Sequence, residues 1–188
     1  MAHSSDSRAP RAVFLFSGGL DSILGAELLL RLGAEVTLLR LHSIFFPLRE
    51  EGYAPDCPAL VREVSEEMLG LVRNPHYGFG KNMNPCLDCK EMMYGKAWQE
   101  AGRIGADFVA TGEVLGQRPM SQREDAFRRM EKGAGLVGKI VRPLSGRLLP
   151  ESDAERQGLI DRNDLLALRG RSRKEQMALA QQLSLIHI

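Results

Sequence analysis

Continuous apolar runs alternate along the chain with segments of helical spacing. Residues 12 to 16 form an uninterrupted apolar run, which is typical of a strand that is buried on both faces of a parallel sheet. Apolar residues at helical spacing follow from 22 to 32, and Gly33 then provides a helix stop. Residues 34 to 41 (AEVTLLRL) are predicted to form a second strand. This order predicts a right-handed βαβ unit, and therefore a parallel sheet covered by helices.

The same alternation continues through the rest of the chain. Further helices are expected at 58 to 69, 90 to 103 and 124 to 132, with a last one that opens near Ser172, and two further strands at 108 to 111 and within 136 to 141. Two Ser-x-x-Glu pairs, Ser121 with Glu124 and Ser172 with Glu175, predict capping boxes at helix starts. The fold class predicted is α/β, a doubly wound parallel sheet with helices on both faces.

Length and composition are consistent with one domain, which we assign to residues 11 to 182 of the 188. Residues 1 to 10 are small and polar, so we expect a disordered tail there. Residues 183 to 188 resemble the translation of a sequencing adapter and are expected to be a non-native tail. No apolar run reaches the roughly 18 residues that span a membrane, and the first residues lack the apolar core of a secretory signal. A cytoplasmic protein is therefore expected, and no feature of the sequence indicates an oligomeric state.

A glycine-rich turn joins the first predicted strand to the first predicted helix. Its residues are Ser17, Gly18, Gly19, Leu20, Asp21 and Ser22. Two adjacent glycines allow a sharp turn, and the helix that follows points its unpaired N–H groups at an anion. Asp21 is a candidate ligand for magnesium. The turn is therefore interpreted as a phosphate cradle, with an ordinary capped strand-to-helix turn as the alternative.

The three cysteines suggest sulfur or metal chemistry. Cys86 and Cys89 have C-x-x-C spacing at the start of a predicted helix, which favours a thiolate, and Cys57 is the third. A structural zinc would need a fourth ligand such as His76. An iron–sulfur cluster held by three thiolates, or a persulfide on one cysteine that another resolves, are the other options. Cys57 alone would more often be an inert buried residue.

More polar residues fall at the edge of the sheet where the cradle lies. The strand at 108 to 111 runs into Gly112, and Gln117, Arg118, Ser121 and Gln122 follow in a loop. His42 ends the second predicted strand at the same edge, where ligands of such sheets bind. The alternatives are a solvated loop with a capped helix and, for His42, an ordinary loop residue.

Several of these motifs resemble known families. SGGLDS resembles the PP-loop of the N-type ATP pyrophosphatases, which have an adenine nucleotide alpha-hydrolase-like fold and split ATP to AMP and pyrophosphate. NPCLDCK, followed by GADFVATGEVLGQRPMSQ, is similar to tRNA thiouridine synthetases of both the 4-thiouridine and the 2-thiouridylase type. The resemblance implies that the residues of the SGGLDS turn bind ATP. It further implies that Cys89 is the active cysteine, with Cys86 as its partner in the iron–sulfur variants. Because no cysteine follows Cys89, Cys57 would have to act as the second sulfur-handling residue.

The activity implied by this resemblance is ATP-dependent thiolation of a uridine in tRNA. It would use ATP and magnesium, either an iron–sulfur cluster or a persulfide, and a sulfur donor in the form of sulfide or a persulfide carrier. Basic segments support a polyanionic partner, since residues 117 to 147 carry a net charge of +5 and residues 162 to 174 carry +4, although the whole chain carries only +1. The alternatives are a PP-loop enzyme that acts on a small molecule and a non-catalytic zinc- or nucleotide-binding module.

Overall fold

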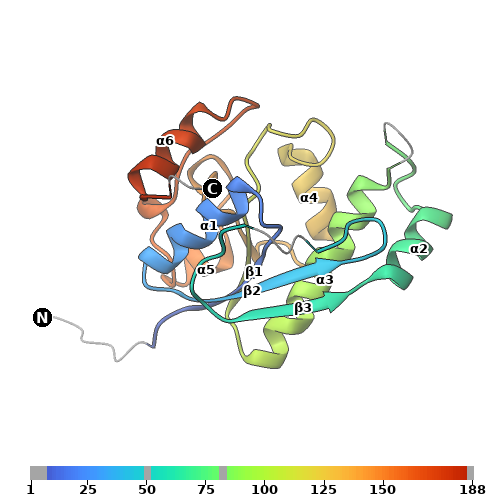
Figure 1. Cartoon of the computed structure of the whole chain (residues 1–188), viewed down its shortest axis with the longest axis horizontal. Helices are drawn as coiled ribbons and strands as arrows, with labels where there is room; N and C mark the ends of the chain where they lie inside the picture. Colours follow the sequence, from blue (N-terminus) through green and yellow to red (C-terminus); the bar gives the residue numbers. More distant parts are fainter. Residues whose placement is uncertain (1–7, 49–51, 81–83, 186–188) are drawn as a thin grey trace, which may run out of the picture.

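The computed structural model describes residues 8–48, 52–80 and 84–185 (Figure 1). Its centre is a five-stranded sheet in which every pairing is parallel, with the strand order β3-β2-β1-β4-β5. The strands are β1 (Arg11–Leu15), β2 (Glu35–His42), β3 (Ala59–Glu63), β4 (Phe108–Thr111) and β5 (Ile140–Val141). The helices are α1 (Leu20–Arg31), α2 (Ser65–Arg73), α3 (Cys86–Ile104), α4 (Glu124–Gly133), α5 (Asp153–Arg156) and α6 (Lys174–Gln182). Two short 3₁₀ turns lie at Gly146–Leu148 and Arg162–Asp164.

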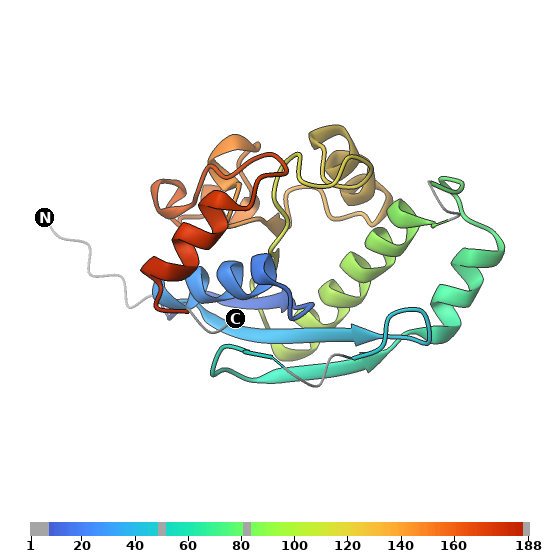
Figure 2. The same cartoon turned by 45° about the horizontal axis from the view of Figure 1, so that its top comes forward.

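Helices cover both faces of the sheet (Figure 2). Side chains alternate along β1, so Phe14 packs with α1, α5 and α6 on one face, whereas Val13 packs against α3 on the other. Tyr94 of α3 packs in turn with Phe127 and Met130 of α4. The predicted fold class, a doubly wound parallel sheet with helices on both faces, is confirmed.

The order of the strands places a crevice beside β1. The chain moves outward from β1 through β2 to β3, and it then crosses back to β4 on the other side of β1. Leu15 at the end of β1 is paired with Thr111 at the end of β4. At such a topological switch point the loops after the two strands diverge and leave room for a ligand. The segments that follow Leu15 and Thr111 are the glycine turn and the Gly112 loop.

The prediction of a single helix over residues 58 to 69 is wrong. The chain forms β3 and then α2, because β3 is an edge strand whose residues alternate between exposed and half-buried positions. Pro58 suits an edge position since it has no N–H group to donate, and its carbonyl accepts a hydrogen bond from the Leu38 amide at 2.8 Å. Cys57 therefore precedes a strand, and no helix begins at that residue.

The predicted capping boxes are also wrong, although both helices exist. Helix α4 begins after Arg123 and α6 begins after Arg173, and neither N-cap residue makes a side-chain cap bond. Ser121 is buried instead of capping a helix. The chain does contain a capping box, and it lies at Ser152 and Glu155 of α5.

The predicted tails are only partly visible in the structure. Residues 1–7 and 186–188 lie outside the described residues, so most of the expected disordered tail and the end of the expected non-native tail are not described. Arg8 forms an ion pair with Asp107, and Leu185 packs into the core. None of the described helices is both long and apolar enough to cross a membrane.

Candidate functional site

The glycine turn leaves β1 and enters α1 within four residues. Gly18 has φ +73°, a conformation that a side chain disfavours, and Gly19 is the N-cap of α1. The Gly19 carbonyl accepts hydrogen bonds from the Ser22 amide (2.9 Å) and the Ser22 hydroxyl (2.7 Å), and the Ser17 and Ser22 hydroxyls lie 3.2 Å apart. The first amides of α1 precede its first intrahelical hydrogen bond and remain available for an anion.

Gly112 holds the start of α1 against the end of β4. A Cβ atom at this position would lie 2.3 Å from the Asp21 carbonyl oxygen and 2.6 Å from the Ser22 Cα atom. Those atoms belong to the backbone and cannot rotate away, so only glycine fits. The sequence assigned Gly112 to cofactor binding, and the structure shows it in contact with the backbone of the cradle.

The Asp21 carboxylate lies in the first turn of α1, beside this contact with Gly112. Its Oδ2 atom accepts a hydrogen bond from Gln117 Nε2 at 2.8 Å, whereas Oδ1 is buried and has no hydrogen-bond partner in the described structure. A buried carboxylate oxygen without a partner is costly unless a cation or a donor reaches it. This atom fits magnesium, which uses one or two carboxylates together with phosphate oxygens.

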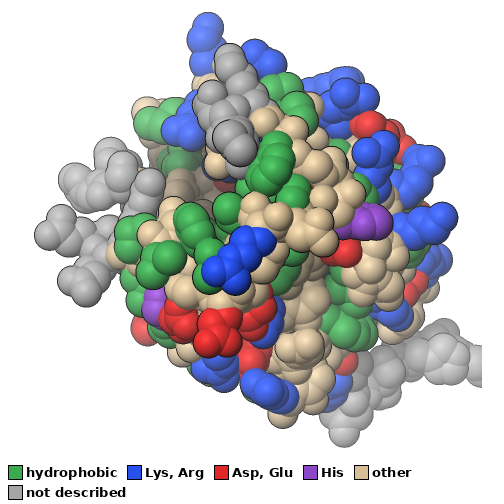
Figure 3. Space-filling view, turned by 90° about the vertical axis from the view of Figure 1, so that its right-hand side faces the viewer, with side chains coloured by type: hydrophobic (Ala, Val, Ile, Leu, Met, Phe, Trp, Pro, Cys, Tyr) green, Lys and Arg blue, Asp and Glu red, His purple; other side chains and the backbone are tan. Residues whose placement is uncertain are grey.

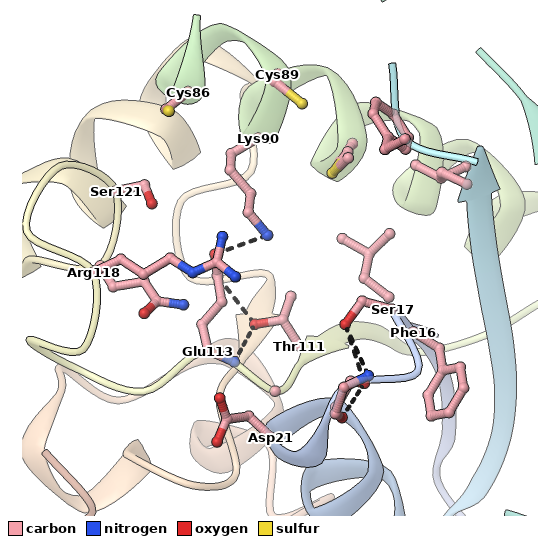
Figure 4. Close-up of a pocket in the computed structure, with 18 of the residues that line it drawn as sticks. Phe16, Ser17, Asp21, Cys86, Cys89, Lys90, Thr111, Glu113, Arg118 and Ser121 are labelled. Atoms are coloured by element: carbon pink, nitrogen blue, oxygen red, sulfur yellow. Dashed lines mark hydrogen bonds and ion pairs between the residues drawn. The ribbon is translucent and has the colours of Figure 1, made fainter. Parts of the chain in front are cut away.

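A cleft of about 600 Å³ brings the cradle and two of the cysteines together (Figure 4). Ser17, Gly19, Leu20, Asp21 and Ser22 form one side of it, and the start of α3 forms another. The lining also includes Gly112, Glu113, Arg118, Ser121, Gln122, Cys86, Cys89, Lys90 and Arg173. Gln117 reaches the cleft through its bond to Asp21. His42 is not among the residues that line it, and its carbonyl bonds the Val64 amide, so the structure gives no support for His42 as a ligand.

The structure separates the third cysteine from the other two. Cys86 opens α3 and Cys89 lies one turn later, both at the carboxyl edge of the sheet. Cys57 precedes β3, at the opposite edge, in a second cavity lined by Arg11 and Glu35 from the starts of β1 and β2. The predicted site of three cysteines is therefore not assembled, and Cys57 has no part in the cleft.

An iron–sulfur cluster or a zinc ion does not fit the residues present. Within the described ranges, no group of three or more His, Cys, Asp or Glu residues is placed to hold a metal. The Cys86 and Cys89 sulfur atoms also point apart, with Cys86 on the side of Ser121 and Arg118 (Figure 4). Two thiols are suited to sulfur relay, whereas a cluster or a structural zinc requires more ligands.

The expectation that the start of the helix favours a thiolate is wrong for Cys89. Burial raises the pKa of Cys89 above its ordinary value of 9.0, and the neighbouring Lys90 charge only partly offsets this effect. Burial also raises the pKa of Cys57, where Glu27 and Asp56 act in the same direction. Cys89 is therefore a protonated thiol at neutral pH in the structure described.

A buried polar network lies beneath the cleft, and the sequence analysis did not identify it. Glu113 Oε2 accepts hydrogen bonds from the Tyr94 hydroxyl (2.5 Å), Thr111 Oγ1 (3.1 Å) and Arg142 Nε (3.3 Å). Lys90 Nζ lies 3.4 Å from the other oxygen, Oε1. Burial would raise the pKa of Glu113, but the Lys90 and Arg142 charges hold it below its ordinary value of 4.5. Glu113 is therefore an anion that fixes Lys90 in the cleft.

Arg142 anchors this network from the other side. Only 4% of its side chain is exposed, and Nη1 donates to Glu131 Oε1 of α4 at 2.6 Å. Its guanidinium carbon lies 3.8 Å from the centre of the Phe127 ring. The charged residue within an apolar strand segment, I-V-R-P-L at 140 to 144, was the sequence signal that could have pointed to this network.

Comparisons with known proteins agree with the motifs. No model of a known protein family matches the chain. The chain is 31% identical over 148 residues to a probable tRNA sulfurtransferase of Thermococcus kodakarensis, a match that covers 72% of this chain and 37% of that protein. It is also 31% identical over 121 residues to a tRNA-specific 2-thiouridylase of Desulfosudis oleivorans, covering 57% of this chain and 33% of that protein. The chain therefore spans about a third of the length of these curated relatives.

A solved structure shows the same fold. The structure of a 4-thiouridine synthetase–RNA complex with bound ATP aligns with 94% of this chain and 52% of that chain, with a TM-score of 0.53 and 17% identity. The chain thus shares the fold of this 4-thiouridine synthetase, and in sequence it resembles both the tRNA sulfurtransferases and the tRNA-specific 2-thiouridylases.

Proposed function

We propose that this chain catalyses ATP-dependent thiolation of a uridine in tRNA. The observation that carries the proposal is that one cleft holds both a phosphate cradle and a pair of thiols. A cradle alone fits any enzyme that splits ATP, and a thiol pair alone fits a redox protein. Their presence in one cleft supports a reaction in which ATP activates an atom that sulfur then replaces.

The first step is activation of the base. The uridine carbonyl oxygen attacks the α-phosphate of ATP, a P–O bond breaks, and pyrophosphate leaves, so the base carries an adenylate. The amides at the start of α1 and the Ser17 and Ser22 hydroxyls bind the leaving pyrophosphate. Asp21 would hold a magnesium ion, which supplies charge neutralisation at the phosphates when it is bound. Lys90, Arg118 and Arg173, which all line the cleft, stabilise the negative charge that develops.

The second step is sulfur transfer. A sulfur donor delivers sulfur to Cys89 as a persulfide, and the terminal sulfur attacks the activated carbon. AMP leaves with the former carbonyl oxygen. The Cys86 side chain then rotates toward Cys89 and its thiolate attacks the Cys89 sulfur, which leaves the outer sulfur on the base and forms a disulfide between the two cysteines. An external dithiol reduces this disulfide and restores the site.

The test is tRNA-dependent chemistry with purified protein. The chain is incubated with ATP, magnesium, a persulfide donor and unmodified tRNA, and we measure AMP, pyrophosphate and thiouridine in the digested tRNA. We expect all three products with tRNA and little AMP without it. Release of pyrophosphate with a small molecule but not with tRNA would contradict the tRNA assignment. ATP binding without any pyrophosphate release would contradict the enzymatic role.

A further inference from the structure

Two basic segments that are far apart in the sequence lie side by side at the mouth of the cleft. The loop after β4 and the segment before α6 are joined by a hydrogen bond from the Gly170 amide to the Leu115 carbonyl (2.7 Å) and by a bridge between Leu115 and Arg169. Gly116 and Gly170 also approach closely, since a Cβ atom on Gly116 would lie 3.5 Å from the Gly170 nitrogen. Figures 1 and 2 both show these segments together beside the start of α6.

Together these segments present five exposed cations, which we call the basic rim. Its members are Arg118, Arg169, Arg171, Arg173 and Lys174. Arg118 and Arg173 also line the cleft, so the rim begins at the site and extends outward. Among the described residues no carboxylate forms an ion pair with any of the five, whereas Arg123, just before α4, and Arg128 of α4 are paired with Asp125 and Glu124. The rim is therefore a concentrated positive charge that nothing in the described chain neutralises.

The opposite side of the cleft, at the end of β3 and the start of α2, carries acidic side chains. The end of β3 and the first turn of α2 carry Glu63, Glu66 and Glu67, of which Glu67 is paired with Lys96 of α3. In the space-filling view, basic side chains gather along the top and right of the face, and acidic side chains form a cluster below the centre with a few Lys or Arg side chains around it (Figure 3). A polyanion would be attracted to the rim and repelled from the α2 side, so the charge distribution favours its approach to the cleft from the rim side.

We propose that the basic rim binds the phosphate backbone of the substrate tRNA and that the target uridine enters the cleft from the rim side. This inference rests on the proposed function. Residues Arg169 and Arg171 provide charge outside the cleft, where the ATP phosphates do not reach. Contacts of this kind release counterions from the RNA, so they contribute affinity that falls steeply as the salt concentration rises. The acidic α2 side keeps the neighbouring nucleotides away from the opposite wall.

The test compares two double variants with the same change in net charge. Arg169→Ala/Arg171→Ala removes two rim cations, and Arg8→Ala/Arg103→Ala removes two exposed cations from the amino edge of the sheet. The Arg8 and Arg103 side chains are 61% and 68% exposed and pair with Asp107 and Glu100. Glu100 keeps Arg62 as a second partner, so the control leaves this buried carboxylate paired. The dissociation constant for unmodified tRNA is measured by fluorescence anisotropy at several salt concentrations, and ATP binding is measured separately.

For the rim variant we expect tRNA affinity to fall on the order of tenfold, and the salt dependence to decrease by roughly one unit of slope for each lost phosphate contact. The control variant should bind tRNA within about twofold of the wild type. Equal tRNA affinity for the two variants would overturn the proposal, as would weaker ATP binding by the rim variant in the absence of tRNA. If the rim variant alone loses tRNA affinity and the wild type releases no pyrophosphate with tRNA, the basic rim is a tRNA-binding surface but the proposed thiolation activity is refuted.

Discussion

The contact between Gly112 and the start of α1 makes a direct prediction about the cradle. In Gly112→Ala, the new methyl group would lie 2.3 Å from the Asp21 carbonyl oxygen, whereas ordinary contact begins at 3.4 Å. The start of α1 must therefore move by roughly 1 Å, because the Cβ atom is fixed to the backbone of residue 112 and the atoms that it meets are backbone atoms of Asp21 and Ser22. The displaced segment includes Asp21 and Ser22, so the change alters the phosphate cradle itself.

The size of the effect follows from this displacement. Overpacking of a tight core contact costs about 1 to 3 kcal/mol of unfolding free energy. A misplacement of about 1 Å in a catalytic group costs on the order of 100-fold in rate. Gly112→Ala should therefore remain folded at 25 °C but should lose about two orders of magnitude in tRNA-dependent pyrophosphate release.

The assay combines urea unfolding with single-turnover measurement of pyrophosphate. A matched control is Gly102→Ala in α3, where a Cβ atom meets nothing within 4 Å. The control should be as active as the wild type and more stable by about 0.5 to 1 kcal/mol, because alanine is the better helix former. If Gly112→Ala has wild-type stability and activity, the close contact does not position the cradle.

The remaining predictions concern the cysteines and the two carboxylates of the site. Cys89→Ser should bind ATP normally but form no thiouridine. Cys57→Ser should retain thiolation, because Cys57 lies at the other edge of the sheet. Mass spectrometry of digested tRNA distinguishes these two outcomes. Glu113→Gln should lose about 3 kcal/mol of unfolding free energy at pH 7, because it breaks a buried ion pair. The Lys90 and Arg142 charges lower the pKa of Glu113 in the folded protein. The difference in unfolding free energy between the wild type and Glu113→Gln is therefore fully present above about pH 4.5, and it shrinks as the pH falls through the lower folded-state pKa. Urea unfolding at several pH values measures this difference. Asp21→Asn should require on the order of tenfold more magnesium for half-maximal pyrophosphate release, and an unchanged magnesium dependence would remove Asp21 as the metal ligand.

The βαβ unit and the cradle could be predicted because their determinants are local. The apolar runs, the glycine pair and the helix after it are adjacent in sequence, and a parallel sheet then fixes which edge carries the loops. The same logic placed Cys86 and Cys89 at the start of α3, because the Pro- and Gly-rich segment before them cannot continue a helix.

The parts that could not be predicted depend on contacts between distant segments. The sequence predicts a helix where β3 lies, because the exposed edge position of β3 leaves only a weak alternation of apolar residues, and this prediction places Cys57 wrongly at a helix start. The Glu113 network joins Lys90 and Tyr94 of α3 to Arg142 after β5, and no pattern in the sequence relates these segments. Ser121 matched a capping box by spacing alone, whereas packing buries it in the wall of the cleft.

The central claim is that the uridine carbonyl oxygen bonds to the α-phosphate of ATP before sulfur attacks, and that it then leaves as part of AMP. This claim is tested most directly with tRNA that carries ¹⁸O at the carbonyls of its uridines, incubated with the protein, ATP and a persulfide donor. The proposed reaction predicts AMP that contains one ¹⁸O atom for each thiouridine formed, because the P–O bond is made to the carbonyl oxygen. Thiouridine formation with AMP that carries no ¹⁸O would show that the base is not adenylated and would contradict the proposed mechanism.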